Sequence, residues 1–331
     1  MYRIGILGSG GWGTALSIPL SHNGHSVLMW AFEPETAQEI NTKHTNSIFL
    51  DGITIPEAVK ATKDFSLMAD LDIYVIAVPT QFIRSISPML NKLAQGKPVV
   101  NVAKGIERNT LLRVSGILEQ SAGIASSQYV ILTGPSHAEE VARGLPTTVV
   151  AASGRKRLSG EIQKVFSTPY FRVYSSEDVT GCELGGAVKN VIAIAAGIID
   201  GLGLGDNTKA ALITRGLAEM SRLGVALGAN PITYSGLSGL GDLYVTCSSR
   251  HSRNRKTGEL IGKGMKPAEI ISDTKMIAEG VFTTESAYHL ARQTGVEMPI
   301  VEQVYNIIFN GREPQKAIKE LMTRSSKSEW W

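Results

Sequence analysis

In the first half of the chain, short apolar runs rich in β-branched residues alternate with segments whose apolar residues recur every three or four positions. This alternation predicts strands joined by helices, and therefore a mainly parallel sheet with crossover helices. The predicted strands cover residues 3–7, 26–31, 73–78, 98–102, 129–133 and 146–151.

Beyond about residue 186, long helical patterns replace the strand signals, and glycine-rich connectors at 201–205 and 236–241 separate them. We therefore expect two domains: an α/β domain with a doubly wound, mainly parallel sheet over residues 1–186, and an all-helical domain over residues 187–331. The boundary is placed near Gly185 and Gly186. The predicted helices of the second domain cover residues 187–199, 208–227, 255–263, 283–294, 299–309 and 314–323.

The composition narrows the classes of protein that fit. The length of 331 residues suits two domains, and a net charge of +3 is too small to predict a nucleic acid as partner. Cys182 and Cys247 lack the spacing of a metal site or a disulfide framework, so reduced thiols in a cytoplasmic protein are expected. The N-terminus enters a strand directly, without a signal peptide pattern. Lys189 and Asp200 interrupt the most apolar later stretch, so no membrane span is expected.

Residues 8–13 read GSGGWG, a GxGxxG motif between the first predicted strand and a helical pattern. Gly8 would permit the tight turn, Gly10 a close approach of a pyrophosphate, and Gly13 close packing of helix on strand. The N-terminus of the helix would offer free N–H groups to the phosphates. The motif therefore predicts a Rossmann domain that binds a dinucleotide; a glycine turn without a ligand is the alternative.

Glu33 stands twenty positions beyond Gly13, where an acidic residue commonly binds the ribose 2′-hydroxyl. No Lys or Arg lies between Leu28 and Thr42 to bind a 2′-phosphate, which favours NAD. The alternative is that Glu33 or Glu35 is a solvated surface charge. Further along the chain, predicted strands end at 78, 102 and 133, and ligands of parallel sheets bind outside such carboxyl ends.

Longer motifs identify a family. They are AKGIE at 103–107, GPSHAEEVA at 134–142, GGAVKNVIAIAAGIIDGLGLGDNTKAALITRGLAEM at 185–220, LSGLGDLYVTC at 237–247, SRNRKTG at 252–258 and AEGVFTTESA at 278–287. Through them the chain resembles the bacterial NAD(P)-dependent glycerol-3-phosphate dehydrogenases over essentially its full length. The resemblance implies a cytoplasmic homodimer that uses NAD(P)H and no metal. Such an enzyme reversibly reduces dihydroxyacetone phosphate to sn-glycerol 3-phosphate for glycerophospholipid synthesis.

The resemblance also implies residue roles. Lys189 would accept the proton in alcohol oxidation, and Lys104 would be a second substrate lysine. The implied substrate contacts are Lys104, Gly134, Ser136, Lys189, Asp242, Ser252, Arg253 and Asn254. The implied cofactor contacts are Gly8, Gly10, Gly11, Trp12, Gly13, Phe32, Glu33, Lys104, Ala138, Arg253 and Glu279.

Two positions depart from the family's commonest pattern. Gly11 stands where serine is frequent, so a hydroxyl contact to phosphate is missing. Phe32 stands where a His or Arg often helps to accept NADP, so this departure puts the use of NADP in doubt.

The chemistry of the residues agrees with these roles. Apolar neighbours on both sides of Lys189 favour a neutral amine, which can accept a hydroxyl proton; a snorkelling or paired lysine is the alternative.

In the basic run 250–256, Ser252 is predicted to cap a helix whose free N–H groups suit a phosphate, although a solvated basic loop is the usual interpretation of such a run. Asp206 and Asn207 either orient Lys189 or turn the chain. His137 is interpreted as a loop residue near the site.

Two other functions fit the same architecture. One is a two-domain dehydrogenase for a hydroxyacid or a ketopantoate-like substrate, which would need a cation for a carboxylate rather than a phosphate-shaped cluster. The other is a non-catalytic sensor of nicotinamide dinucleotides. Fold analogy does not choose among the three, whereas turnover and a substrate panel do.

Overall fold

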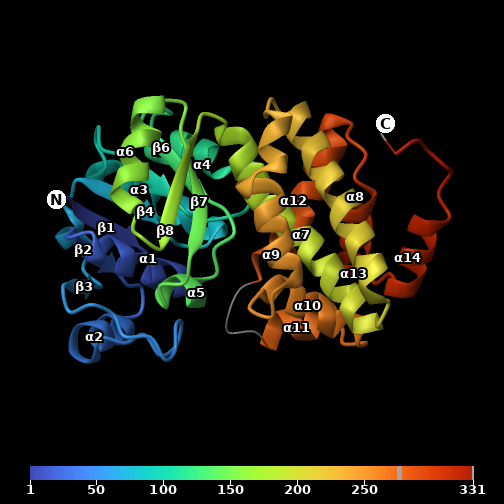
Figure 1. Cartoon of the computed structure of the whole chain (residues 1–331), viewed down its shortest axis with the longest axis horizontal. Coiled ribbons are helices and arrows are strands. Elements are labelled where there is room, and N and C mark those ends of the chain that lie inside the picture. The colour runs from blue at the N-terminus through green and yellow to red at the C-terminus, as the bar shows by residue number, and fades with distance from the viewer. Residues whose placement is uncertain (274–277, 330–331) are drawn as a thin grey trace.

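A computed structural model of the chain describes residues 1–273 and 278–329 (Figure 1). Its first part is an eight-stranded sheet in the order β3-β2-β1-β4-β5-β6-β7-β8. Neighbouring strands are parallel except β6 and β7, which are antiparallel. The strands are β1 (Arg3–Leu7), β2 (Ser26–Trp30), β3 (Val59–Thr62), β4 (Ile73–Ile76), β5 (Val99–Asn101), β6 (Tyr129–Thr133), β7 (Thr147–Ala152) and β8 (Phe171–Ser176).

All six predicted strands are confirmed, and the mainly parallel sheet with them. The two strands that were not predicted, β3 and β8, form the edges of the sheet. An edge strand has fewer buried positions than a central strand. In β8, buried and exposed residues alternate over the first four positions, and neither of the last two residues is buried. Its sequence FRVYSS therefore lacks the continuous apolar run on which the other predictions depended.

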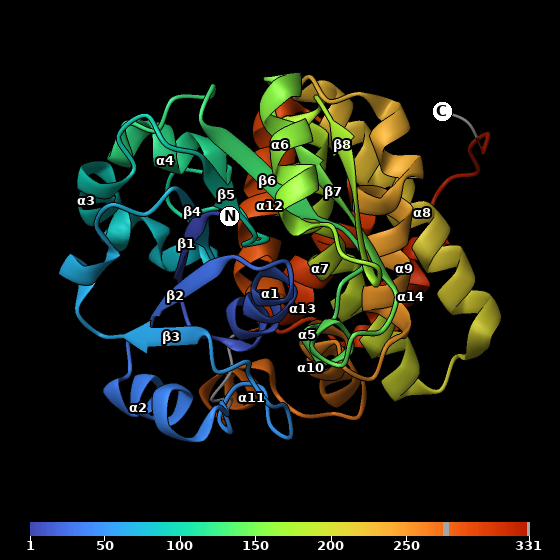
Figure 2. The same cartoon turned by 60° about the vertical axis from the view of Figure 1, so that its left-hand side comes forward.

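Helices cover both faces of the sheet, so the sheet is doubly wound (Figure 2). Leu16 of α1 and Ile162 of α6 pack with Ile4 and Ile6 on one face. Ile83 of α3 and other residues of α3 and α4 pack on the opposite face. The helices of this half are α1 (Gly11–His22), α2 (Pro34–Lys43), α3 (Ile83–Leu93), α4 (Val114–Ala122), α5 (Ala138–Ala142) and α6 (Lys156–Phe166).

In the second half, every secondary-structure element within residues 179–273 and 278–329 is a helix. Its helices are α7 (Val179–Leu202), α8 (Gly205–Ala226), α9 (Asp242–Ser248), α10 (Arg253–Gly262), α11 (Pro267–Asp273), α12 (Glu279–Thr294), α13 (Pro299–Phe309) and α14 (Pro314–Met322). The six predicted helices are confirmed, whereas the short α9 and α11 were not predicted. The terminal Trp330 and Trp331 lie outside the described residues.

Helix α7 connects the two halves. It begins eight residues before the predicted helix at 187, so the predicted boundary at Gly185 and Gly186 lies inside it. Of the described helices, α7 is long and apolar enough to cross a membrane by length and composition, and its most apolar window is completely buried within the protein. The division into domains at this boundary remains a prediction.

The first turns of α7 are tied to the sheet half by the buried carboxylate of Glu183. It accepts hydrogen bonds from the backbone N–H of Ser115 (2.8 Å), the hydroxyl of Ser115 (2.7 Å) and the hydroxyl of Tyr129 (2.6 Å), and it pairs with Arg113. A carboxylate with this many donors holds its helix firmly. The position of Lys189, less than two turns further along α7, is thereby fixed relative to the sheet.

Helices α7 and α10 pack unusually closely because glycines face each other. A Cβ on Gly197 would lie 1.9 Å from a backbone oxygen of α10, and one on Gly258 would lie 1.9 Å from a backbone oxygen of α7. Gly201 and Gly262 repeat these contacts one turn further along. No side chain larger than hydrogen fits at this distance, so the glycines set how near the N-terminus of α10 approaches α7.

Candidate active site

The glycine loop at the end of β1 has the geometry that the sequence predicted. Gly8 has φ of 117°, in the region that favours glycine, and a Cβ there would lie 2.8 Å from the backbone of Ala77. A Cβ on Gly13 would lie 2.2 Å from the carbonyl oxygen of Gly8. Gly10 instead borders open space, with no atom within 4 Å of its would-be Cβ. The loop therefore has room for a phosphate where the motif needs it.

Packing explains why Gly11 departs from serine. A Cβ at this position would lie 2.7 Å from the carbonyl oxygen of Phe49 and 3.9 Å from the Cβ of Ala138. Serine would force the segment around Phe49 to move, so the lost hydroxyl is coupled to a close approach of that segment. The neighbouring Trp12 has a buried indole N–H with no hydrogen-bond partner in the described part of the chain. An orphaned donor beside the loop fits a ligand rich in acceptor oxygens.

Phe32 and Glu33 follow β2 at the surface. The ring of Phe32 is 78% exposed and stands edge-on to Trp30, with 6.3 Å between the ring centroids. Glu33 occupies the position before α2, and its side chain makes no capping hydrogen bond. Both side chains are thus open to a ligand at the end of β2, and the alternative of a solvated Glu33 stays open as well.

Two lysines share one buried carboxylate at the junction of the halves. Lys189 Nζ lies 2.9 Å from Asp242 Oδ1, and Lys104 Nζ lies 2.6 Å from Asp242 Oδ2. Lys104 follows β5, Lys189 lies on α7, and Asp242 begins α9. The structure therefore brings together three of the predicted substrate residues from three distant segments. Lys189 is paired with a carboxylate, which is one of the alternatives that the sequence left open.

In this cluster, burial and the opposite charge of the partner shift the pKa in opposite directions, both for Lys104 and for Asp242. Burial lowers the pKa of Lys104 to about 8, although the attraction of Asp242 counteracts it, and the charge of Lys189 lowers it further. Burial alone would raise the pKa of Asp242, but the two ammonium groups and their hydrogen bonds outweigh burial and hold this pKa below its usual value. The carboxylate is thus ionised, and Lys104 is the cation of the pair that loses its proton more readily than an ordinary lysine.

Two residues that the sequence analysis did not single out complete this cluster. Lys189 Nζ donates to the hydroxyl of Thr246 at 2.6 Å, and that hydroxyl itself donates to the backbone oxygen of Asp242 at 2.6 Å. Asn190 is buried and its side-chain N–H lies 3.5 Å from the backbone oxygen of Lys104. Thr246 lies one turn beyond Asp242 on α9. Because α9 was not predicted, nothing in the sequence indicated that the two side chains lie together.

The loop after β6 holds Lys104 from the other side. Gly134 adopts φ of 143°, and its carbonyl oxygen accepts hydrogen bonds from Lys104 Nζ (3.0 Å) and the hydroxyl of Ser136 (2.8 Å). Pro135 packs against the connector that leads into α9, 3.5 Å from a would-be Cβ on Gly241. The predicted positions Gly134 and Ser136 therefore lie beside the lysine cluster.

The basic run at 250–256 begins a helix, as predicted. Ser252 caps α10 by accepting a hydrogen bond from the backbone N–H of Arg255 (3.2 Å). Asn254 accepts from the backbone N–H of Gly280 at 3.0 Å, which joins the first turn of α10 to the start of α12. Arg253 is exposed on the same turn. The free N–H groups of this turn and the guanidinium are the donors a phosphate requires.

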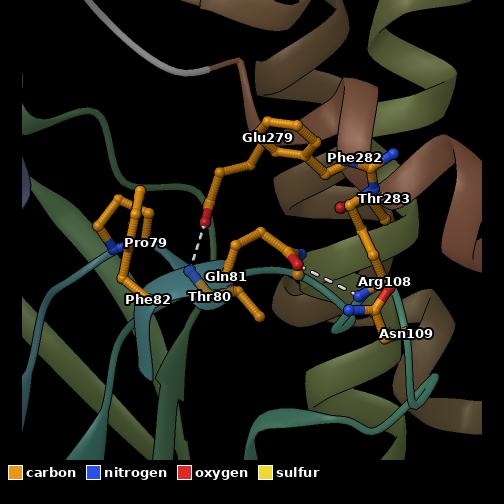
Figure 3. A pocket seen from close by; sticks show the side chains of 10 residues that line it. Pro79, Thr80, Gln81, Phe82, Arg108, Asn109, Glu279, Phe282 and Thr283 are labelled. Atoms are coloured by element: carbon orange, nitrogen blue, oxygen red, sulfur yellow. Dashed lines mark hydrogen bonds between the residues drawn. The ribbon is translucent and has the colours of Figure 1, made fainter. Parts of the chain in front are cut away.

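A pocket of about 270 Å³ lies between the loop after β4 and the start of α12 (Figure 3). Glu279 crosses it to accept a hydrogen bond from the backbone N–H of Thr80 at 2.8 Å, and burial raises the pKa of this carboxyl. The hydroxyls of Thr80 and Thr283 line the pocket, and each is buried without a hydrogen-bond partner in the described residues. Phe82 and Phe282 supply apolar walls. Orphaned hydroxyls beside an apolar wall fit a polar ligand with a flat ring.

The position of Asp206 and Asn207 decides between the two roles considered for them. Asp206 and Asn207 lie exposed in the first turn of α8, so they start a helix and do not reach into the buried cluster. Within residues 1–273 and 278–329, no group of three or more His, Cys, Asp or Glu side chains is placed to hold a metal ion.

A mainly parallel Rossmann-like sheet with a GxGxxG loop after its first strand, followed by a helical second half, is the architecture of a class of nicotinamide-dependent dehydrogenases. Two family descriptions match the chain: the N-terminus of NAD-dependent glycerol-3-phosphate dehydrogenase over residues 3–159 and its C-terminus over residues 178–319. The chain belongs to the NAD-dependent glycerol-3-phosphate dehydrogenase family.

Curated relatives and solved structures agree. The chain is 48% identical to the glycerol-3-phosphate dehydrogenase (NAD(P)+) of Enterococcus faecalis, with 99% of this chain and 97% of that protein covered. It is 49% identical to the enzyme of the same name from Chlorobium limicola, with 99% of each covered. The crystal structure of glycerol-3-phosphate dehydrogenase from Coxiella burnetii superimposes with a TM-score of 0.92 at 35% identity, covering 98% of this chain and 99% of that one. A ketopantoate reductase from Ralstonia eutropha shares only the fold, with a TM-score of 0.60 at 14% identity.

Proposed function

We propose that the protein is an sn-glycerol-3-phosphate dehydrogenase, which reduces dihydroxyacetone phosphate with NAD(P)H and also catalyses the reverse reaction. The observation that carries the proposal is the buried carboxylate of Asp242 between the ammonium groups of Lys104 and Lys189. Asp242 holds these ammonium groups, which can donate a proton, between the dinucleotide-binding fold and the N-terminus of α10, the helix end proposed to bind phosphate. Relatives that are 48% and 49% identical over nearly the whole chain carry this enzyme name.

The nicotinamide cofactor, when bound, supplies or accepts the hydride. Gly8, Gly10 and Gly13 would hold its pyrophosphate against the start of α1, with Trp12 and Ala138 beside the loop. The remaining proposed cofactor contacts are Gly11, Phe32, Glu33, Lys104, Arg253 and Glu279.

Lys189 exchanges a proton with the reacting oxygen of the substrate. In reduction, its ammonium form donates to the oxygen that becomes the hydroxyl; in oxidation, its neutral form accepts that proton. Asp242 and Thr246 hold the Nζ atom in one orientation, so the donor is positioned before the substrate arrives. Lys104, whose pKa is lowered to about 8 by burial, provides a second donor for the same oxygen or its neighbour.

The phosphoryl group of the substrate would be bound by the start of α10. Ser252, Arg253 and Asn254 contribute the helix N-terminus, a guanidinium and an amide. Gly134 and Ser136 line the other side through the loop that holds Lys104. We further propose a cytoplasmic homodimer with no nucleic-acid partner, which supplies glycerophospholipid synthesis.

The test is a steady-state assay of dihydroxyacetone phosphate reduction, with NADH and NADPH in parallel. Turnover with either cofactor is expected, and the absence of a cation between residues 28 and 42 favours NADH. A panel containing ketopantoate and 2-keto acids separates the related dehydrogenases. Absence of turnover with every substrate would instead support the non-catalytic sensor.

A further inference from the structure

The side chain of His137, close to the candidate active site, has a ring nitrogen that lacks a hydrogen-bond partner in the described part of the chain. The residue follows Ser136 and precedes the short helix α5. This nitrogen, Nε2, is buried. A buried polar nitrogen without a partner is costly, and a group bound beside it, such as a ligand, is one way in which such a nitrogen is satisfied.

The ring of His137 lies against the phosphate-binding segment. Its centroid is 5.8 Å from that of His251, at an interplanar angle of 50°. His251 directly precedes Ser252, the cap of α10. The histidine pair therefore joins the loop after β6 to the start of α10, across the junction of the two halves.

Burial and the neighbouring charges act together on the protonation of His137. Burial, and then the positive charge of Lys189, lowers the pKa of His137, with a smaller contribution in the same direction from Lys104. Glu139 and Glu140 act in the opposite sense and only partly offset this effect. The lowered pKa favours the neutral imidazole, which keeps one N–H to donate, and the exposed Arg253, two positions beyond His251, supplies positive charge for a phosphate at the start of α10.

We propose that His137 is a substrate-binding residue whose Nε2–H donates a hydrogen bond to the phosphoryl group of the substrate. This inference rests on the proposed function for the identity of the substrate. The sheet half would then contribute its own phosphate donor, and the substrate would be held from both sides: by His137 from the loop after β6, and by Arg253 and Asn254 from α10.

The experiment compares His137→Phe, which keeps a ring beside His251 but removes the donor, with His137→Gln, which keeps an N–H at similar reach. Binding of sn-glycerol 3-phosphate is measured by calorimetry, and the KM and kcat for dihydroxyacetone phosphate by steady-state kinetics. We expect His137→Phe to weaken binding and raise the KM about 10- to 100-fold, the effect of one hydrogen bond to a charged group, with a smaller change in kcat. His137→Gln should recover most of the loss.

A matched control is His22→Phe, because His22 is an exposed histidine whose ring stands edge-on to Tyr170 on the sheet half. It should behave as the wild type. Unphosphorylated dihydroxyacetone provides the second control, since loss of a phosphate contact should spare it. Unchanged binding in His137→Phe, or an equal loss for the phosphorylated and unphosphorylated ketones, would overturn the inference. If the wild type binds sn-glycerol 3-phosphate without turnover, the proposed function fails, while the calorimetric comparison still decides the role of His137.

Discussion

Replacement of Asp242 by asparagine probes the electrostatic arrangement of the site. Asparagine has nearly the same shape as aspartate but carries no charge. In the native protein, the two carboxylate oxygens of Asp242 lie 2.9 Å from Lys189 Nζ and 2.6 Å from Lys104 Nζ. The substitution would therefore leave two buried amines without their shared counterion, while the packing stays the same.

The expected loss of stability follows from the burial of the group. The side chain of Asp242 is only 2% exposed, and removing one partner of a buried ion pair costs about 3–5 kcal/mol because the other charge is left uncompensated. The loss should depend on pH. The pKa of Lys104 is already lowered to about 8, and without the attraction of Asp242 it falls further. Near pH 9 this amine is neutral in the folded variant, so the destabilisation should be smaller than at pH 7.

Urea unfolding followed by tryptophan fluorescence at pH 7 and pH 9 measures both effects, and steady-state kinetics should show a fall in kcat/KM of about 100-fold or more. Asp51→Asn serves as the control, because Asp51 is exposed in a turn and its change should stay within about 0.5 kcal/mol. Wild-type stability of Asp242→Asn at pH 7, or an equal loss at both pH values, would show that the carboxylate does not compensate two charged lysines.

Three further predictions concern other residues. Lys189→Ala should abolish turnover while the dissociation constant for NADH, measured by fluorescence titration, stays nearly unchanged; a wild-type rate would exclude Lys189 as the proton donor. Arg253→Ala should mainly raise the KM for dihydroxyacetone phosphate, by about 10-fold or more, and an unchanged KM would contradict the proposed phosphate site. Burial raises the pKa of Glu219 to about 7, from 4.5, although the carboxylate accepts backbone hydrogen bonds from Ile300 (2.8 Å) and Val301 (3.3 Å). The folded protein therefore holds this proton more tightly, and the wild type should lose up to about 3 kcal/mol of unfolding free energy between pH 4.5 and 7 relative to Glu219→Gln; parallel pH profiles of the two proteins in urea would refute this.

The sheet was predictable because its central strands are buried on both faces. Strands such as β4 and β6 are continuous apolar runs with every residue buried, and such runs are visible in a sequence. The edge strands β3 and β8 and the short helices α9 and α11 lack that signal. α9 has only seven residues, follows a glycine-rich connector and spans less than two periods of a helical pattern, so periodicity could not define it.

For the site, the sequence could predict residues whose conformation is local, and it could not predict pairings between distant segments. The roles of Gly8 and Gly13 and the cap at Ser252 follow from neighbouring positions alone. Nothing in the sequence places Asp242 between two lysines that precede it by 138 and 53 positions. The neutral amine expected for Lys189 was inferred from its neighbours in sequence, whereas its partner in space is a carboxylate.

The same reasoning explains why the glycines of α7 and α10 matter to the chemistry. From the sequence alone, Gly197 and Gly258 are helix residues that mildly destabilise their helices. The structure shows that both lie where α7 and α10 touch and where a side chain would clash. Because no Cβ fits at these positions, the backbones of α7 and α10 approach more closely than any larger residue there would permit. Glu183 ties α7, which carries Lys189, to the sheet half, so the contact between α7 and α10 also constrains where Lys189 lies relative to the N-terminus of α10. Under the proposed function, this helix contact would help to set the distance between the amine that acts on the carbonyl oxygen and the helix end that binds the phosphoryl group of the substrate.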